Sequence, residues 1–95
     1  MSMLFEWDED KAESNLRKHR VPFDEAQTVF LDDLSITVPD ADHSQTEVRF
    51  RIVGMSDKKR VLVVSFTERG ERIRLISARK ARRSEIKDYE EKGFD

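Results

Sequence analysis

Apolar and polar residues alternate in three stretches of the second part of the chain, 34–38, 47–54 and 72–78, as in strands with one face against a core. A further stretch, 61–66, is almost entirely apolar, so we expect it to be a central strand covered on both faces. Gly70 stands in the short turn before the last stretch, where it suits a positive φ.

Helical patterns flank these stretches. A short alternation at 4–7 predicts a brief first strand, and Asp8 is then a good N-cap for a helix that runs to about residue 19. Apolar residues with helical spacing follow Pro22 and end before Asp32. The charged segment 79–92 predicts a C-terminal helix.

The resulting order is β-α-α-β-β-β-β-α over residues 1–95, with no repeat and no flexible linker. Adjacent strands joined by short turns favour an antiparallel sheet with the helices segregated against it. We therefore expect a single α+β domain whose antiparallel sheet has about four strands, with two N-terminal helices and one C-terminal helix.

Composition excludes several classes of protein. The 95 residues suffice for one modest core, and no apolar run is long enough to span a membrane. The N-terminus lacks the pattern of a signal peptide. The absence of cysteine removes disulfides, thiolate metal sites and cysteine nucleophiles, and it fits a cytoplasmic location. His19 and His43 do not have metal-ligand spacing.

The net charge of −2 hides a strong asymmetry along the chain. Residues 1–47 carry twelve acidic and four basic side chains, a balance of −8, whereas residues 58–83 carry ten basic and two acidic side chains, a balance of +8. Such a split favours a basic interaction surface, although charges that mix in three dimensions would also be compatible with it.

Strand alternation predicts where the basic residues meet, because successive side chains point to opposite faces of a sheet. If apolar residues of 47–54 and 72–78 face the core, their alternates share the other face, above Val61, Val63, Ser65 and Thr67 of the strand between. The inward set is Val48, Phe50, Ile52, Ile73 and Leu75, and the outward set is Glu47, Arg49, Arg51, Arg72 and Arg74.

Arginine binds phosphate oxygens in pairs, so this face is suited to a polyanion such as RNA. Arg79 is expected at the junction of the last strand and the C-terminal helix, with further cations just beyond it at Lys80, Arg82 and Arg83. The alternative is that Glu47, Glu68 and Glu71 pair with the arginines across strands.

Candidates for acid–base chemistry are few. His19 titrates near neutrality unless perturbed, although a histidine at a helix end is commonly structural. His43 stands in a polar loop and has no expected role. The run Asp8-Glu9-Asp10 could bind a divalent cation but is typical of a helix N-terminus. These residues alone leave enzyme and binding module both open.

Several motifs together resemble the BrnT family. They are the start Phe5-Glu6-Trp7-Asp8, the pair Lys18-His19, the spacing Glu47-x-Arg49, and the run from Arg74 through Ile76-Ser77-Ala78-Arg79-Lys80-Ala81, followed by Glu85 and Tyr89. The resemblance covers essentially the whole chain. The family usually has glycine at the position of Arg20, where a left-handed helix C-cap would cost arginine about 1 kcal/mol.

The resemblance implies a bacterial type II toxin with a RelE-like fold, a ribonuclease that arrests translation. It implies a partner antitoxin, BrnA, which binds DNA and represses the shared operon, so that DNA is contacted only through the antitoxin complex.

A mechanism follows as a hypothesis. RNA carries its own nucleophile, the 2′-hydroxyl, so cleavage needs no metal or other cofactor. Arg49, Arg74 and Arg79 would hold the scissile phosphate and stabilise the transition state. Proton transfer would fall to His19, Glu47 or Lys18. Further RNA contacts would come from Arg51, Arg72, Lys80, Arg82 and Arg83. The alternative is a non-catalytic module that binds RNA or a protein partner through the same face.

Overall fold

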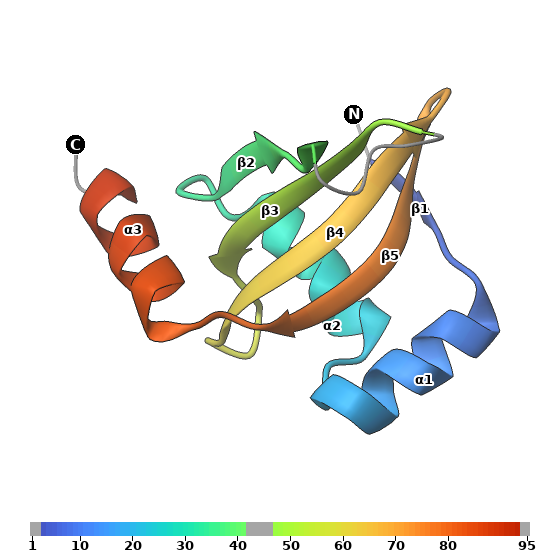
Figure 1. The fold of residues 1–95 in the computed structure, drawn as a ribbon, viewed down its shortest axis with the longest axis horizontal. Coiled ribbons are helices and arrows are strands. Elements are labelled where there is room, and N and C mark those ends of the chain that lie inside the picture. The colour runs from blue at the N-terminus through green and yellow to red at the C-terminus, as the bar shows by residue number, and fades with distance from the viewer. Residues whose placement is uncertain (1–2, 42–46, 94–95) are drawn as a thin grey trace.

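In the computed structural model, which describes residues 3–41 and 47–93, five strands form one sheet with helices around it (Figure 1). The strands are β1 (Leu4–Glu6), β2 (Ile36–Pro39), β3 (Arg49–Met55), β4 (Val61–Arg69) and β5 (Arg72–Lys80). The helices are α1 (Glu9–His19), α2 (Phe23–Ala26), which continues as the 3₁₀ segment η1 (Gln27–Leu31), and α3 (Arg83–Gly93). The α+β class and the order of elements are confirmed.

The sheet is mixed, with the order β1-β5-β4-β3-β2. The pairs β2–β3, β3–β4 and β4–β5 are antiparallel, whereas β1 runs parallel to β5 with Leu4 opposite Arg72. The expectation of about four antiparallel strands was therefore wrong at this edge. The helices α1 and α2 carry the chain from β1 at one edge of the sheet to β2 at the opposite edge. The first strand, β1, therefore lies beside the last strand, β5, and runs in the same direction.

The start of α1 follows the predicted cap. The Asp8 carboxylate accepts hydrogen bonds from the backbone N–H groups of Asp10 (2.8 Å) and Lys11 (3.2 Å). The helix ends at Arg20, whose φ of 60° is in the left-handed region. Glycine would be less strained than arginine at this position.

Three local expectations were wrong. The predicted second helix forms only four α-helical residues before it tightens into η1. Val48 lies before the first residue of β3 and is 63 % exposed instead of facing the core. Arg79 and Lys80 belong to β5 and not to the C-terminal helix. The last strand is longer than its apolar pattern because backbone pairing with β4 continues as far as Lys80 opposite Leu62.

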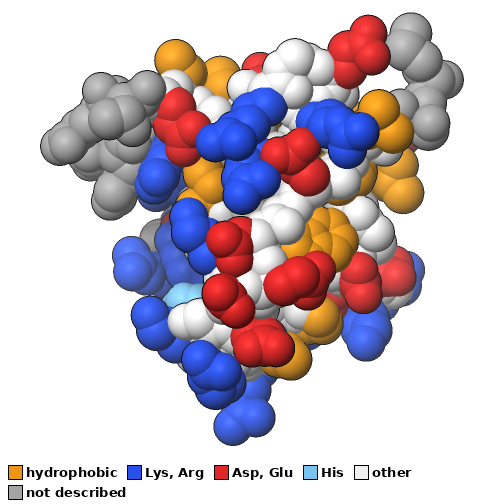
Figure 2. All heavy atoms as spheres, turned by 90° about the vertical axis from the view of Figure 1, so that its right-hand side faces the viewer, with side chains coloured by type: hydrophobic (Ala, Val, Ile, Leu, Met, Phe, Trp, Pro, Cys, Tyr) orange, Lys and Arg blue, Asp and Glu red, His pale blue; other side chains and the backbone are white. Residues whose placement is uncertain are grey.

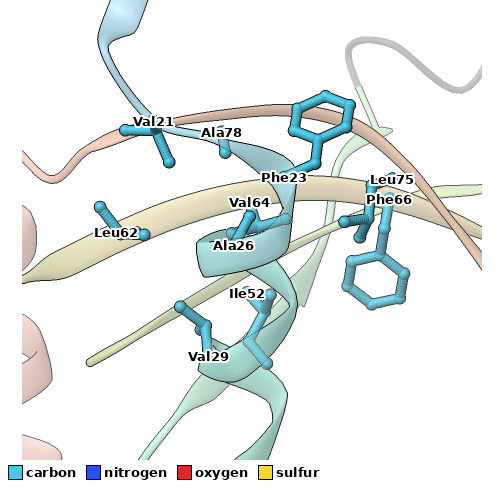
Figure 3. Close-up of a cluster of buried hydrophobic side chains, with 10 residues drawn as sticks. All are labelled: Val21, Phe23, Ala26, Val29, Ile52, Leu62, Val64, Phe66, Leu75 and Ala78. Carbon is cyan, nitrogen blue, oxygen red and sulfur yellow. The ribbon is translucent and has the colours of Figure 1, made fainter. Parts of the chain in front are cut away.

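The core lies between the sheet and the segment that contains α2 and η1. In Figure 3, Ala26 and Val29 of this segment point toward Val64 and Ile52 of the sheet. Gly54 of β3 permits this close approach: a Cβ at this position would lie 2.9 Å from Cγ1 of Val29.

Helix α1 is attached to the edge of β5 by one buried side chain. The Asn15 amide donates to the carbonyl oxygens of Ala78 (2.8 Å) and Val21 (3.0 Å), and its oxygen accepts from the Ala78 N–H at 3.0 Å. The strand β1 is too short to pair with this part of β5. Asn15 therefore satisfies the backbone N–H and carbonyl of Ala78, which a longer neighbouring strand would otherwise pair.

The buried Glu25 links α2 to the turn between β3 and β4. It pairs with the Arg60 guanidinium and accepts a hydrogen bond from the Ser56 hydroxyl at 2.6 Å. The hydrogen bonds from Arg60, opposed in part by burial, hold the pKa of Glu25 below its ordinary value. Arg60 is therefore part of the scaffold and not part of a binding surface.

Helix α3 lies beside the end of β3, apart from the other helices (Figure 1). The Tyr89 hydroxyl donates to Asp32 at 2.5 Å, and the same carboxylate accepts from the backbone N–H groups of Met55 (2.8 Å) and Leu34 (3.0 Å). Burial, together with the hydrogen bond to Asp32, raises the pKa of Tyr89 to about 12. Asp32 thereby fixes α3 against the strands.

Candidate functional site

Arginines from two strands lie on the face of the sheet opposite the core. Arg49 of β3 is paired with Thr67 of β4, which is paired with Arg74 of β5. Arg51 is likewise opposite Ser65. Residues directly opposite each other in a ladder share a face. The alternation argument from the sequence is therefore confirmed for Arg49, Arg51, Arg72 and Arg74, and we call this surface the arginine face.

A β-bulge adds Arg79 to the arginine face. Phe66 is opposite Leu75 while its neighbour Ser65 is opposite Ser77, so Ile76 is an extra residue in β5. An extra residue reverses the alternation of all side chains that follow it. Without the bulge, Arg79 would point to the same side as Leu75, which faces the core.

The bulge opens onto a pocket of about 320 Å³ in the arginine face. Its lining consists of Asp40, Arg49, Arg51, Ser65, Ile76, Ser77 and Arg79. Guanidinium and hydroxyl groups from three adjacent strands, together with one carboxylate, therefore surround a single space. We call it the arginine pocket.

Carboxylates pair with the arginines around the pocket. Glu85 of α3 accepts from the two terminal nitrogens of Arg79 at 2.8 and 2.9 Å, and from the backbone N–H of Arg82 at 2.7 Å. The Arg79 hydrogen bonds, opposed in part by burial, lower the pKa of Glu85 to about 2. The guanidinium of Arg79 is therefore held in a fixed orientation at the pocket wall.

Two other carboxylates form ion pairs with arginines of the strands. Glu6 of β1 pairs with Arg74 at 2.8 Å and, more loosely, with Arg72 at 3.9 Å. Glu47 lies 3.6 Å from Arg49 and 3.8 Å from Arg69. Pairing between carboxylates and the basic strands is thus part of the structure, as the alternative interpretation required. The sequence suggested Glu47, Glu68 and Glu71 as the carboxylates that pair with these arginines. Among the ion pairs of the described residues, Glu47 is the one of these three that takes part.

Arg51 differs from these arginines. Within residues 3–41 and 47–93, no carboxylate forms an ion pair with it. An anion in the pocket would therefore not compete with an ion pair for this guanidinium group.

Several residues predicted for the site are elsewhere. Lys18 and His19 are exposed at the C-terminal end of α1, and neither lines the arginine pocket. Lys80 is opposite the buried Leu62, on the side of the core. Arg82 and Arg83 are exposed at the start of α3. His43 is outside the described residues.

The sequence interpretation missed Asp40 and Ser77. The alternation Ile36, Val38, Asp40 would have placed Asp40 on the arginine face once β2 was paired with β3. Ser77 could not be assigned to this face without knowledge of the bulge. Pairing with the N-terminal Glu6 was also missed, because it depends on the parallel contact between β1 and β5.

A groove of about 210 Å³ adjoins the arginine pocket, with apolar strand residues on one side and charged residues of α3 on the other. The strands contribute Ile36, Val38, Val53 and Val63, and α3 contributes Glu85, Asp88 and Lys92. Arg51 lines both spaces. A molecule that fills the groove would thus approach the centre of the pocket.

The charge asymmetry of the sequence is only partly preserved in space. On the side of the molecule that carries β1 and α1, acidic side chains gather in the lower half of the view with Lys and Arg side chains around them (Figure 2).

Within the described ranges there is no group of three or more His, Asp or Glu side chains that could hold a metal ion. No helix in these ranges has the length and apolar character needed to cross a membrane.

Comparison with known proteins decides the family. The family model described as the ribonuclease toxin BrnT of type II toxin–antitoxin systems matches residues 7–85, most of the chain. The chain belongs to the BrnT family. The crystal structure of the Brucella abortus ribonuclease toxin BrnT has a similar fold, with a TM-score of 0.67 and 22 % sequence identity over 86 % of this chain and 100 % of that one. No curated protein sequence matches the chain significantly.

Membership of the BrnT family establishes the general function. The chain is the toxin of a type II toxin–antitoxin system, an endoribonuclease whose target is RNA and whose partner is an antitoxin. Of the two possibilities that the residues alone left open, enzyme and binding module, the enzyme is correct at the level of the family.

Proposed function

We propose that the arginine pocket is the site at which this BrnT toxin cleaves RNA, that cleavage requires no metal ion, and that the nucleophile is the substrate's own 2′-hydroxyl. The observation that carries the proposal is the bulge in β5, which brings Arg79 into one pocket with Arg49 and Arg51. Three guanidinium groups around one space supply the positive charge that a pentacoordinate phosphorane requires.

The roles of the arginines follow from their partners. Arg79 is already oriented by Glu85, so it offers its remaining N–H groups to the scissile phosphate without reorganisation. Arg51 has no ion pair in the described residues that phosphate binding would have to break. Arg49 completes the set from the same strand as Arg51.

The serine hydroxyls on the pocket floor add neutral donors for the non-bridging oxygens. Ser65 and Ser77 are directly opposite each other in β4 and β5. Arg72 and Arg74 lie farther along the arginine face, where they would contact neighbouring phosphates of the RNA chain together with exposed cations of the β5–α3 connection. The three groups that the sequence suggested for proton transfer, His19, Lys18 and Glu47, do not line the pocket.

The experiment is RNA cleavage by purified toxin with an Arg51→Ala variant, in buffer that contains a chelator. Arg51 has no ion-pair partner in the described part of the chain, so its removal breaks no ion pair there. We expect the catalytic rate constant to fall ~10²–10³-fold, as for loss of one transition-state donor. Chelator should leave the wild-type rate unchanged.

Arg17→Ala is the matched control, because Arg17 is an exposed arginine on α1 that does not line the pocket. The substrate should resist cleavage when its 2′-hydroxyl is replaced by hydrogen, and the products should end in a 2′,3′-cyclic phosphate and a 5′-hydroxyl. Full activity of the Arg51 variant, or loss of wild-type activity in chelator, would contradict the proposal. Binding without any cleavage would favour a non-catalytic role for this chain.

For the biological setting, we propose RelE-like arrest of translation in the cytoplasm and a BrnA-like antitoxin that contacts operator DNA, so that the toxin reaches DNA only through the complex. An antitoxin segment could place apolar side chains against the strand side of the groove and a carboxylate beside the arginines of the pocket, and it would then cover the pocket. Co-expression of the neighbouring gene should restore growth and RNA integrity. If it does not, the neighbouring gene does not encode the antitoxin.

A further inference from the structure

The proposed reaction needs a group that removes the proton of the 2′-hydroxyl, and the arginine pocket contains one carboxylate, Asp40. The backbone N–H of Asp40 donates to the Arg49 carbonyl at 2.8 Å, which extends the β2–β3 ladder by one residue beyond Pro39 and Phe50. Val38, two residues earlier, is opposite Arg51. By the same alternation, the side chain of Asp40 lies on the arginine face beside Arg49.

Asp40 is only 7 % exposed, so its carboxylate is almost completely withdrawn from bulk water. Burial of a carboxylate to this extent is costly unless positive charges lie beside it. Here the facing charges are Arg49 and Arg51 from β3 and Arg79 from β5, with Glu85 on α3 acting on the pocket through Arg79.

We propose that Asp40 is the proton acceptor of the ribonuclease reaction. This inference rests on the proposed function, because it requires the scissile phosphate to lie in the arginine pocket. In the described ranges, none of the other residues that line the pocket is a carboxylate or a histidine. Of these lining side chains, Asp40 is thus the one that can take a proton near neutral pH, because arginines stay protonated and serine hydroxyls do not ionise there.

The 2′-hydroxyl proton passes to the Asp40 carboxylate while the 2′-oxygen forms a bond to phosphorus. The bond from phosphorus to the 5′-oxygen breaks, its electron pair leaves with that oxygen, and a proton from solvent completes the 5′-hydroxyl. Protonated Asp40 then releases its proton to solvent. The products are a 2′,3′-cyclic phosphate and a 5′-hydroxyl, with no net change in protons and no oxidation or reduction.

The position beside Arg49 and Arg51 suits this role. The arginines hold the scissile phosphate, so the ribose that carries the attacking 2′-hydroxyl lies on the same face of the sheet as the Asp40 carboxylate. A purely structural Asp40 would instead only compensate the arginine charges, and it would act on RNA binding and folding, not on the chemical step.

The test is single-turnover cleavage of RNA by the full chain carrying Asp40→Asn, with RNA affinity, melting temperature and the pH dependence of the rate measured in parallel. Asparagine has the same size but cannot accept the proton. We expect the cleavage rate to fall ~10²–10⁴-fold, with RNA affinity equal to or greater than that of wild type. The low-pH rise of the wild-type rate, which reports ionisation of the acceptor, should be absent in the variant.

Asp40→Glu tests the same role without removing the charge. It should retain the low-pH rise at a lower rate, because the carboxylate is present but displaced by one methylene group. Asp33→Asn, at an exposed aspartate that does not line the pocket, is the matched control and should cleave like wild type.

The outcomes separate the two proposals. If Asp40→Asn cleaves within about threefold of wild type, or if Asp40→Glu lacks the low-pH rise, Asp40 is not the proton acceptor, and loss of cleavage in Arg51→Ala would still support the pocket. The same conclusion follows if RNA affinity falls in parallel with the rate. If Arg51→Ala cleaves like wild type, the pocket itself is wrong and the role of Asp40 falls with it.

Discussion

The ion pair between Glu85 and Arg79 connects the stability of the toxin to the geometry of its proposed site, and Glu85→Gln tests it. Glu85 receives two hydrogen bonds from Arg79 and one from the Arg82 backbone. The Arg79 bonds are the largest cause of the lowered pKa of Glu85, from 4.5 to about 2, and burial opposes them. Glutamine keeps the shape of the side chain but loses the charge and one acceptor.

The magnitude follows from the pKa. A difference of this size corresponds to about 3 kcal/mol of stabilisation as an upper value. The two side chains are 22–25 % exposed, so solvent screening reduces this to about 1–2 kcal/mol. For a chain of 95 residues, 1 kcal/mol changes the melting temperature by about 4–8 °C. We therefore expect Glu85→Gln to melt about 5–15 °C below wild type at pH 7.

The pH dependence provides a second measurement. Because folding lowers the pKa of Glu85, its contribution is complete above the unfolded value of 4.5 and is lost as the pH falls toward 2. Thermal unfolding followed by circular dichroism should show this additional loss in wild type and not in Glu85→Gln. Glu91→Gln on the same helix is the control, since the exposed pair of Glu91 with Lys87 spans 4.0 Å and is expected to contribute little.

Two results would refute this reasoning. One is a Glu85→Gln protein that melts at the wild-type temperature at pH 7. The other is a variant whose stability declines below pH 4.5 as steeply as that of wild type. Either result would mean that Arg79 finds equivalent partners without Glu85, so that Glu85 does not determine the orientation of this guanidinium.

Two further predictions concern the scaffold that carries the pocket. Gly54→Ala should destabilise the fold by about 1–3 kcal/mol in urea unfolding, because the added Cβ would lie 2.9 Å from Cγ1 of Val29, and a wild-type midpoint would contradict the proposed close contact. The single tyrosine, Tyr89, should titrate near pH 12 in an absorbance titration, with its contribution to stability present below pH 10 and lost as the pH rises toward 12. Tyr89→Phe should remove that pH dependence and lower the free energy of unfolding by about 1.5–3 kcal/mol, because the lost hydrogen bond is to the Asp32 carboxylate. Equal stability of variant and wild type would exclude this role of the hydrogen bond.

Local chemistry made much of the fold predictable. Asp8 specifies the start of α1 because its carboxylate satisfies N–H groups of the first turn, which depends only on residues within three positions. Gly70 likewise has the positive φ expected for the turn between β4 and β5. Alternation along β3 and the first half of β5 depends on each strand alone, and it correctly predicted that Arg49 and Arg74 share a face.

Features that depend on contacts between distant segments were not predictable in this way. The alternation of 34–38 says nothing about which strand it will meet, so Asp40 could not be assigned to the arginine pocket before β2 was paired with β3. The parallel contact of β1 with β5 joins segments at opposite ends of the chain, and it supplies Glu6 to Arg74. Both depend on tertiary packing that no local pattern encodes.

By itself, the sequence determined the α+β class, the order of elements and a basic face on the sheet. Its motifs, taken together, also indicated the BrnT family, which the family model confirms. The tertiary structure decided which charges form the site. The extra residue at Ile76 reverses the alternation in β5 and brings Arg79 beside Arg51, and carboxylates from α3 and β1 restrain the surrounding arginines. The physical reason is that the direction of a side chain follows from local backbone geometry until a bulge resets it, whereas a partner charge is chosen by whatever the complete fold brings within reach.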